Sequence, residues 1–504
     1  MSTPTPPQPP RLAVQAFWLT ASKLVAAALN IGLPILLVRL MPQTEYGIYK
    51  QAFLFVTTTA NIATLGVGMT AFYFMPRLPE RGGQIALNIL VYNFIAGWIP
   101  LIALALYPQI LQSLFRTDAL GPLALLLGFL VLLTLSASLI QQIATALQDI
   151  RYSTLFVIGT QVSRVIMLGG AAVSFRSVES VLVAALIHQI LSLPVLFWYL
   201  HKKFPRFWAH FDWQFFKEQL GYALPYAAVG VLWVIQRDLD NYFVSALLGP
   251  ADFAIYSVGW IDVPLLSLAL ESVVSVLIIR VSALQQQNRK AEIRALTAAA
   301  TTRFAALQLP LFAILFLAGH DLIVLLYTGA YERSADIFLI SILLLPLGAL
   351  LVEPIARAYK ELRGFVLVLR ISTFVFLCCA LAPVIHHFGM IGATVTAVAA
   401  RAAEHLIIAW RAARAVDASL RDVRLYVGAF KVMGATLVAA LVAWFVRNLI
   451  DPALLIPRLL VVPFAIAAVY LPAVLVLRLP GWEMLSRDRL LSLAKATLRS
   501  VKSA

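Results

Sequence analysis

The sequence has 504 residues, of which 61% are hydrophobic and 12% are charged, and its formal net charge is +15 at pH 7. A soluble globular chain is about half apolar and about a quarter charged. This chain has too little polar surface to cover so much apolar area in water. Its composition therefore excludes a soluble globular protein and indicates helices that lie in lipid.

Apolar stretches long enough to cross a bilayer occur along the whole chain. A transmembrane helix needs about 20 predominantly apolar residues, and these stretches are continuous rather than alternating. We predict an all-α polytopic membrane protein with about 14 transmembrane helices. In chain order they are Val14–Arg39, Lys50–Tyr73, Gln84–Leu106, Leu123–Leu147, Ser153–Val173, Val181–Leu200, Leu220–Leu248, Phe253–Ile279, Phe304–Tyr327, Ile337–Tyr359, Phe365–Ile385, Ile391–Arg411, Val427–Val446 and Leu459–Leu477.

Two pairs of segments recur at nearly the same spacing. Leu40–Tyr49 is similar to Leu247–Tyr256, 207 residues later, and Ile143–Arg151 is similar to Ile355–Arg363, 212 residues later. Each pair falls at the same junction of a six-helix set, so both sets have the same orientation. The sequence therefore predicts two six-helix lobes in a parallel pseudo-repeat around a central cavity.

The predicted layout has six parts. They are a disordered cytoplasmic N-terminus (1–11), an N-lobe (12–200), a cytoplasmic interfacial linker (201–218), a C-lobe (219–412), two helices outside the repeat (424–478) and a basic amphipathic cytoplasmic tail (479–504). The linker and the tail both mix apolar and basic side chains, which suits helices that lie on an anionic membrane surface.

The basic residues are distributed unequally between the two sides of the predicted topology. Sorted by alternate loops and the adjoining helix ends, 27 Lys and Arg residues fall on one side and five on the other. The positive-inside rule places both termini in the cytoplasm. The basic excess is thus a topology signal, and we predict no nucleic-acid partner.

Several loose motifs lie at helix junctions and inside the predicted helices. They are Leu40–Tyr49, Gly221–Pro225, Asp240, Gly249–Tyr256 and Gly389–Ala393. With them the chain resembles, over nearly its whole length, the polysaccharide-transporter (Wzx-type) branch of the multidrug/oligosaccharidyl-lipid/polysaccharide (MOP) exporter superfamily. The resemblance implies a flippase that moves undecaprenyl-diphosphate-linked oligosaccharide across the inner membrane by alternating access, for O-antigen, capsule or exopolysaccharide assembly.

Basic and amide side chains inside the predicted helices are candidates for lining the cavity. A charge at the bilayer centre costs about 3 kcal/mol, so it faces a cavity, finds a partner or reaches the interface. A diphosphate, in turn, needs positive charge to enter a low-dielectric slot. Helical spacing and the repeat favour as cavity residues Lys23, Asn30, Lys50, Asn61, Arg164 and Arg237. The alternative for each charged residue is a structural ion pair or a side chain that reaches the interface.

Acidic residues inside the predicted helices are candidates for ion coupling. Asp240 shares a face with Arg237 and either neutralises it or takes part in coupling. Glu271 and Glu353 have no obvious local basic partner in the sequence. A lone carboxylate in the membrane suits coupling to H⁺ or Na⁺.

Motifs for ATP hydrolysis, metal binding or a nucleophilic serine do not occur in the sequence. We therefore predict a carrier that is not an enzyme, with no cofactor and no metal. The expected partners are the lipid-linked oligosaccharide, membrane lipids, a coupling ion (H⁺ or Na⁺), and a polysaccharide polymerase with its chain-length machinery.

Two other readings stay open. One is a transporter of the same superfamily with another cargo, either a peptidoglycan lipid precursor flippase or a cation-coupled drug antiporter, although a drug antiporter is expected to have a mainly acidic cavity. The other is a membrane polymerase or ligase, which usually carries its chemistry on a large outer loop, and the predicted topology has none.

Overall fold

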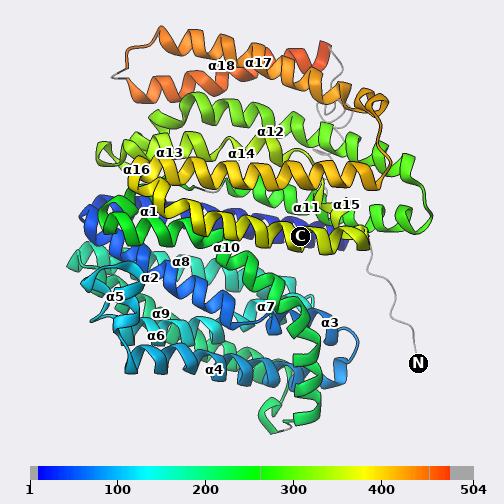
Figure 1. The fold of residues 1–504 in the computed structure, drawn as a ribbon. Coiled ribbons are helices and arrows are strands. Elements are labelled where there is room, and N and C mark those ends of the chain that lie inside the picture. Colours follow the sequence, from blue (N-terminus) through cyan, green and yellow to red (C-terminus); the bar gives the residue numbers. More distant parts are fainter. Residues whose placement is uncertain (1–8, 210, 262, 453, 477–504) are drawn as a thin grey trace. The chain divides into compact units, whose positions relative to one another are not determined.

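The computed structural model describes residues 9–209, 211–261, 263–452 and 454–476, and these residues are almost entirely helical. The chain divides into two compact units, Met1–Ser257 (unit 1) and Val258–Ala504 (unit 2). Figure 1 colours unit 1 blue to green and unit 2 green to orange. Most of the predicted disordered N-terminus (1–11) and the predicted amphipathic tail (479–504) lie outside the described residues.

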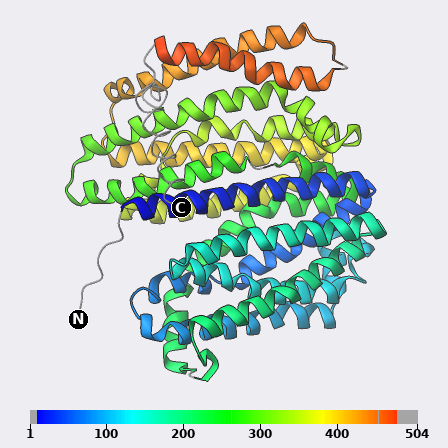
Figure 2. The same ribbon diagram turned by 180° about the vertical axis from the view of Figure 1, so that it is seen from behind.

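Unit 1 is a bundle of long helices joined by short turns. It contains α1 (Pro9–Leu40), α2 (Gln43–Ala63), α3 (Thr70–Phe74), α4 (Gly82–Leu106), α5 (Gln109–Phe115), α6 (Ala124–Ala137), α7 (Leu139–Ala146), α8 (Ile150–Phe175), α9 (Val178–Lys203) and nearly all of α10 (Trp213–Gly259). The helix α1 packs along α8, as Figure 2 shows, and α4 packs along α6.

Side-chain hydrogen bonds attach α10 to the earlier helices of unit 1. They join Gln51 to Ser245 (2.8 Å), Thr58 to Asp238 (2.7 Å) and Asn88 to Gln219 (2.6 Å). The division between the units therefore differs from the predicted lobe boundary at 201–218, because most of α10 packs with the helices that precede it.

Unit 2 is a second helical bundle. It contains α11 (Pro264–Gln286), α12 (Lys290–Tyr327), α13 (Arg333–Ser341), α14 (Leu344–Gly348), α15 (Glu353–Ala358), α16 (Lys360–Ala415), α17 (Val427–Asn448) and α18 (Leu455–Val476). The last two helices lie side by side (Figure 1) and both pack against α12.

Three glycines mark places where the backbone leaves the helical conformation. Gly66, Gly249 and Gly389 have φ angles of 68°, 82° and 60°, a region that glycine enters without a steric penalty. The predicted helix Lys50–Tyr73 is wrong as a single straight span, because α2 ends at Ala63 and the chain bends by 56° before it reaches α3.

The number of membrane crossings depends on how bent helices are counted. Among the described residues, nine helices are long and apolar enough to cross a membrane, or ten if the bent pair of α2 and α3 forms one span. The 56-residue α16 is interrupted at Gly389, where the backbone is not helical, and its two parts lie against each other, since Arg370 of the first part forms an ion pair with Glu404 of the second at 3.4 Å. This element therefore includes both predicted helices Phe365–Ile385 and Ile391–Arg411, and the total of about 14 stays a prediction.

Two glycines allow α4 and α6 to approach closely. A Cβ atom added to Gly97 in α4 would lie 2.8 Å from the Leu132 Cα atom of α6. A Cβ atom added to Gly128 in α6 would lie 2.9 Å from the Leu101 Cα atom of α4. Small residues at a crossing are the usual basis of tight helix packing in membranes.

We expect Gly97→Ala and Gly128→Ala each to destabilise the protein by about 1–3 kcal/mol, because the added methyl group meets backbone that must move. The measurement is the thermal unfolding of the purified protein in detergent. Gly159→Ala in α8 is the matched control, since nothing lies within 4 Å of the added Cβ atom there. Equal stability of all three variants would contradict close packing at this crossing.

A buried carboxylate connects three helices of unit 2. Asp321 in α12 has a side chain that is 2% exposed, and it forms ion pairs with Arg447 of α17 (2.8 Å) and Arg458 of α18 (3.9 Å). Because a buried charge without a partner is costly, this cluster fixes the two C-terminal helices to α12.

Replacing Asp321 with Ala should lower the stability of the protein by about 3–5 kcal/mol, because two largely buried guanidinium groups lose their counter-charge. The melting temperature in detergent reports this loss. Glu332→Ala is the control, since Glu332 is exposed and its carboxylate lies 3.4 Å from His320 rather than against either arginine. A melting temperature for Asp321→Ala equal to that of the control would show that the cluster does not hold α17 and α18.

Candidate substrate-binding site

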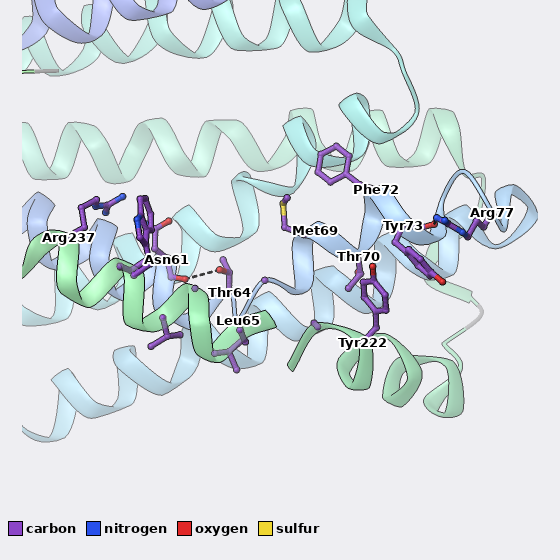
Figure 3. A pocket seen from close by; sticks show the side chains of 17 residues that line it. Asn61, Thr64, Leu65, Met69, Thr70, Phe72, Tyr73, Arg77, Tyr222 and Arg237 are labelled. Atoms are coloured by element: carbon purple, nitrogen blue, oxygen red, sulfur yellow. Dashed lines mark hydrogen bonds between the residues drawn. The ribbon is translucent and has the colours of Figure 1, made fainter. Parts of the chain in front are cut away.

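A pocket of about 650 Å³ opens within unit 1, between the segment that joins α2 to α3 and the first half of α10. Figure 3 shows Asn61 and Arg237 at one end and Tyr73, Arg77 and Tyr222 at the other. The chain bends by 56° between α2 and the segment that follows Gly66, and residues on both sides of the bend line the pocket together with α10.

Aromatic and basic side chains line both ends of the pocket. At one end the Arg77 guanidinium lies 3.9 Å from the centre of the Tyr73 ring, which stacks on Tyr222 at 4.3 Å. At the other end Arg237 lies 4.9 Å from the centre of the Trp233 ring. Such contacts between a guanidinium and an aromatic face are attractive and orient both groups.

The positive charge of Arg237 is neutralised locally. Its Nε and Nη2 atoms donate to the two oxygens of Asp238, at 2.8 and 3.0 Å. The same carboxylate accepts a hydrogen bond from the Thr58 hydroxyl of α2 at 2.7 Å. Asp238 thus orients the guanidinium and ties α10 to α2 at the pocket wall.

A second cationic group lies elsewhere in unit 1 and consists of Lys50 of α2 and Arg164 of α8. Both side chains are half-buried, and the two cations are close enough to interact electrostatically. The Arg164 guanidinium lies 5.3 Å from the Phe53 ring centre. Neither cation forms an ion pair with any residue that the structure describes.

Glu45 lies on α2 before Lys50, but its carboxylate does not pair with Lys50 or Arg164 in the described structure. Glu45 instead accepts a hydrogen bond from the backbone amide of Val178, at the N-terminus of α9, at 2.8 Å. The first amides of a helix attract negative charge, so Glu45 has a structural role of its own. Two neighbouring cations without an acidic partner among the described residues are the arrangement expected of an anion-binding site.

The structure places the six predicted cavity residues in different positions. Asn61 and Arg237 line the pocket, and Lys50 and Arg164 form the second group. Asn30 lies on α1 with an exposed side chain. Lys23 lies on the same helix, but its side chain is outside the described part of the structure.

The three predicted coupling residues have different surroundings. Asp240 is buried and accepts a hydrogen bond from the Tyr256 hydroxyl at 2.7 Å. Glu271 lies on α11 with an exposed side chain, and it interacts with other residues. The expectation that Glu353 lacks a local basic partner was wrong, because Arg357 lies one helical turn later and forms an ion pair with it.

Sequence reasoning missed several residues of the pocket. The sequence gives no sign that Asp238 is the partner of Arg237, because neighbours along a helix are not expected to face each other. Arg77 lies just after the predicted helix Lys50–Tyr73, and Trp233 and Tyr222 carry no signal in an apolar run. Only the bend at Gly66 brings these side chains around one space.

We expect Asp238→Asn and Arg237→Gln to be coupled, with an interaction free energy of about 1 kcal/mol, since each variant removes the same charged hydrogen bonds. Asp238→Asn should be the more destabilising, because it leaves a guanidinium without its counter-charge. A double-mutant cycle on thermal stability in detergent measures this coupling. If the effects of the two substitutions on stability are additive, the interaction between Arg237 and Asp238 makes no net contribution to stability.

Comparisons with known proteins agree with this fold. Among solved structures, the chain is similar to the lipid II flippase MurJ in an inward closed conformation, with TM-score 0.68, 14% identity, and coverage of 93% of this chain and 99% of that chain. The chain is also similar to an inward-facing multidrug resistance MATE family transporter of the MOP superfamily, with TM-score 0.58, 15% identity, and coverage of 80% of this chain and 98% of that chain. For a MOP superfamily transporter from Pyrococcus furiosus, the TM-score is 0.53 and the identity is 13%, with coverage of 80% of this chain and 95% of that chain.

The predicted MOP exporter fold is therefore confirmed. A search of curated protein sequences found no significant match. A model of the family described as polysaccharide biosynthesis protein matches residues 12–278, which is more than half of the chain. This multi-pass membrane protein thus belongs to the polysaccharide biosynthesis protein family.

Proposed function

We propose that the protein is a flippase that moves undecaprenyl-diphosphate-linked oligosaccharide from the inner to the outer leaflet of the bacterial inner membrane, for O-antigen, capsule or exopolysaccharide assembly. The observation that carries this proposal is the cationic group of Lys50 and Arg164 on membrane-spanning helices. Two neighbouring cations in a low-dielectric region repel each other, and a bound diphosphate removes that cost.

The two cations differ in how they hold phosphate. Lys50 offers a compact, mobile point charge, whereas Arg164 offers a planar fork of donors. A diphosphate has oxygens enough for both groups at once, and neither contact is covalent. The pair therefore binds the charged part of a lipid-linked sugar and releases it again, as a carrier requires.

The family and the fold support this class of cargo. The family is one of polysaccharide biosynthesis, and one structure with a similar fold is that of a lipid II flippase. For the transporter from Pyrococcus furiosus, reverse polarity of the binding pocket suggested a different function. Charge within the site is thus a better guide to cargo than the fold, and here it favours an anion over a cationic drug.

The remaining expectations of the sequence complete the proposal. Lys23 and Asn30 on α1 are further candidates for lining the substrate cavity. The coupling ion would be H⁺ or Na⁺, with Asp240, Glu271 and Glu353 as candidates for its binding. Both termini would lie in the cytoplasm, and a polysaccharide polymerase with its chain-length machinery would receive the product. The carrier itself would catalyse no chemical reaction.

Replacing Lys50 or Arg164 with Ala should reduce flipping by about tenfold to a hundredfold, because each charged hydrogen bond to phosphate contributes about 1.5–3 kcal/mol. Lys50→Arg should retain part of the activity, since the charge remains. The measurement is the appearance of fluorescent undecaprenyl-diphosphate-linked oligosaccharide in the outer leaflet of proteoliposomes that contain the purified protein.

Lys431→Ala is the matched control, because Lys431 is exposed on α17, outside both described sites. Unchanged flipping in both Lys50→Ala and Arg164→Ala would refute the cationic site. Flipping of lipid II in place of the oligosaccharide would instead identify the protein as a peptidoglycan precursor flippase. Loss of the gene then distinguishes the same two cargoes in cells, through loss of surface polysaccharide or through loss of the cell wall.

A further inference from the structure

The pocket in unit 1 has the size and lining of a ligand site, but its chemistry differs from that of the cationic group. Its volume of about 650 Å³ lies within the range of small-molecule pockets. Three aromatic side chains on its wall remain accessible, with exposed fractions of 38% for Phe72, 36% for Tyr222 and 46% for Trp233. Flat apolar surfaces therefore face a space that is also lined by amide, hydroxyl and guanidinium groups.

At the end of the pocket that contains Arg237, the local charge argues against a phosphate ligand. Both oxygens of Asp238 already accept from Arg237, so a second anion there would be repelled by the carboxylate. The Arg77 guanidinium lies over the Tyr73 ring and donates to the Tyr73 backbone carbonyl at 2.9 Å. Both guanidinium groups are thus held as oriented hydrogen-bond donors next to aromatic faces, and the one at Arg237 is also paired with a carboxylate.

We propose that this pocket binds a pyranose unit of the transported oligosaccharide, an inference that rests on the proposed flippase function. The C–H groups on one face of a pyranose ring carry partial positive charge and meet the negative face of an aromatic ring. Its hydroxyl groups both donate and accept hydrogen bonds. Trp233 supplies the stacking surface, while Asn61 and the guanidinium of Arg237 bind the hydroxyl groups at the same end of the pocket.

The spacing along α2 connects this sugar site with the cationic group. Lys50 and Asn61 are 11 residues apart on one helix, which is about three turns and about 16 Å, so both side chains lie on the same face. Thr57, between them on that face, is exposed. A short oligosaccharide attached to a diphosphate spans this distance, so one extended substrate reaches both sites along α2.

The proposal predicts that Trp233 affects the binding of sugar but not of the lipid diphosphate. We would measure the affinity of the full-length protein in lipid nanodiscs for two probes, undecaprenyl diphosphate and the undecaprenyl-diphosphate-linked oligosaccharides extracted from the native host. Trp233→Leu should weaken binding of the glycosylated probe by about threefold to tenfold and leave binding of the bare probe unchanged. Trp233→Phe should retain most of the affinity, since it keeps an aromatic face.

Trp198→Leu is the matched control, because Trp198 is also an exposed tryptophan, on α9 and outside the pocket. Equal affinity of the unchanged protein for both probes, or equal effects of Trp233→Leu on both, would overturn the sugar site. Lys50→Ala should weaken the binding of both probes alike. This result distinguishes the cationic site, which binds the diphosphate, from the sugar site. If Lys50→Ala changes neither affinity while Trp233→Leu acts on the glycosylated probe alone, the sugar site stands and the cationic site fails.

Discussion

Neutralisation of charge inside the membrane is the constraint on which this structure depends. Within unit 1, Arg237 is paired with Asp238, and within unit 2, Asp321 is paired with Arg447. Arg370 and Glu404 form a further pair of largely buried side chains at 3.4 Å, both on α16. Each of these pairs satisfies charges that would otherwise be costly in lipid. Lys50 and Arg164 stand out because the described structure offers them no such partner.

This contrast separates structural charges from functional ones. A paired charge needs nothing from a ligand, and its removal is expected to affect stability first. A cation without a described counter-charge lowers its free energy when an anion binds, so its removal is expected to affect transport first. The same reasoning distinguishes the two sites of unit 1, since the pocket beside Arg237 is electrostatically satisfied and the group at Lys50 is not.

Glycine residues determine where the helices of unit 1 bend and where they pack closely. α2 ends at Ala63, and Gly66 takes a positive φ in the bend that follows, where residues on both sides of the bend line the pocket with α10. Elsewhere glycine serves close packing, as at Gly97 and Gly128, where two helix backbones come together. Glycine thus shapes unit 1 by two mechanisms, backbone freedom at one position and the missing side chain at the others.

Composition and hydrophobic length alone determined that the chain is a helical membrane protein, because helices satisfy their own backbone groups in lipid and the apolar runs are long and continuous rather than alternating as in a barrel. The sequence also indicated breaks near Gly249 and Gly389 and singled out Lys50, Arg164, Asn61 and Arg237 from their polarity in apolar runs. It could not show which of these charges had partners. The proximity of Lys50 to Arg164, the hydrogen bond from Thr58 to Asp238 and the aromatic pocket all depend on tertiary packing, since they join residues of different helices whose relative rotation and bending are not encoded in local spacing.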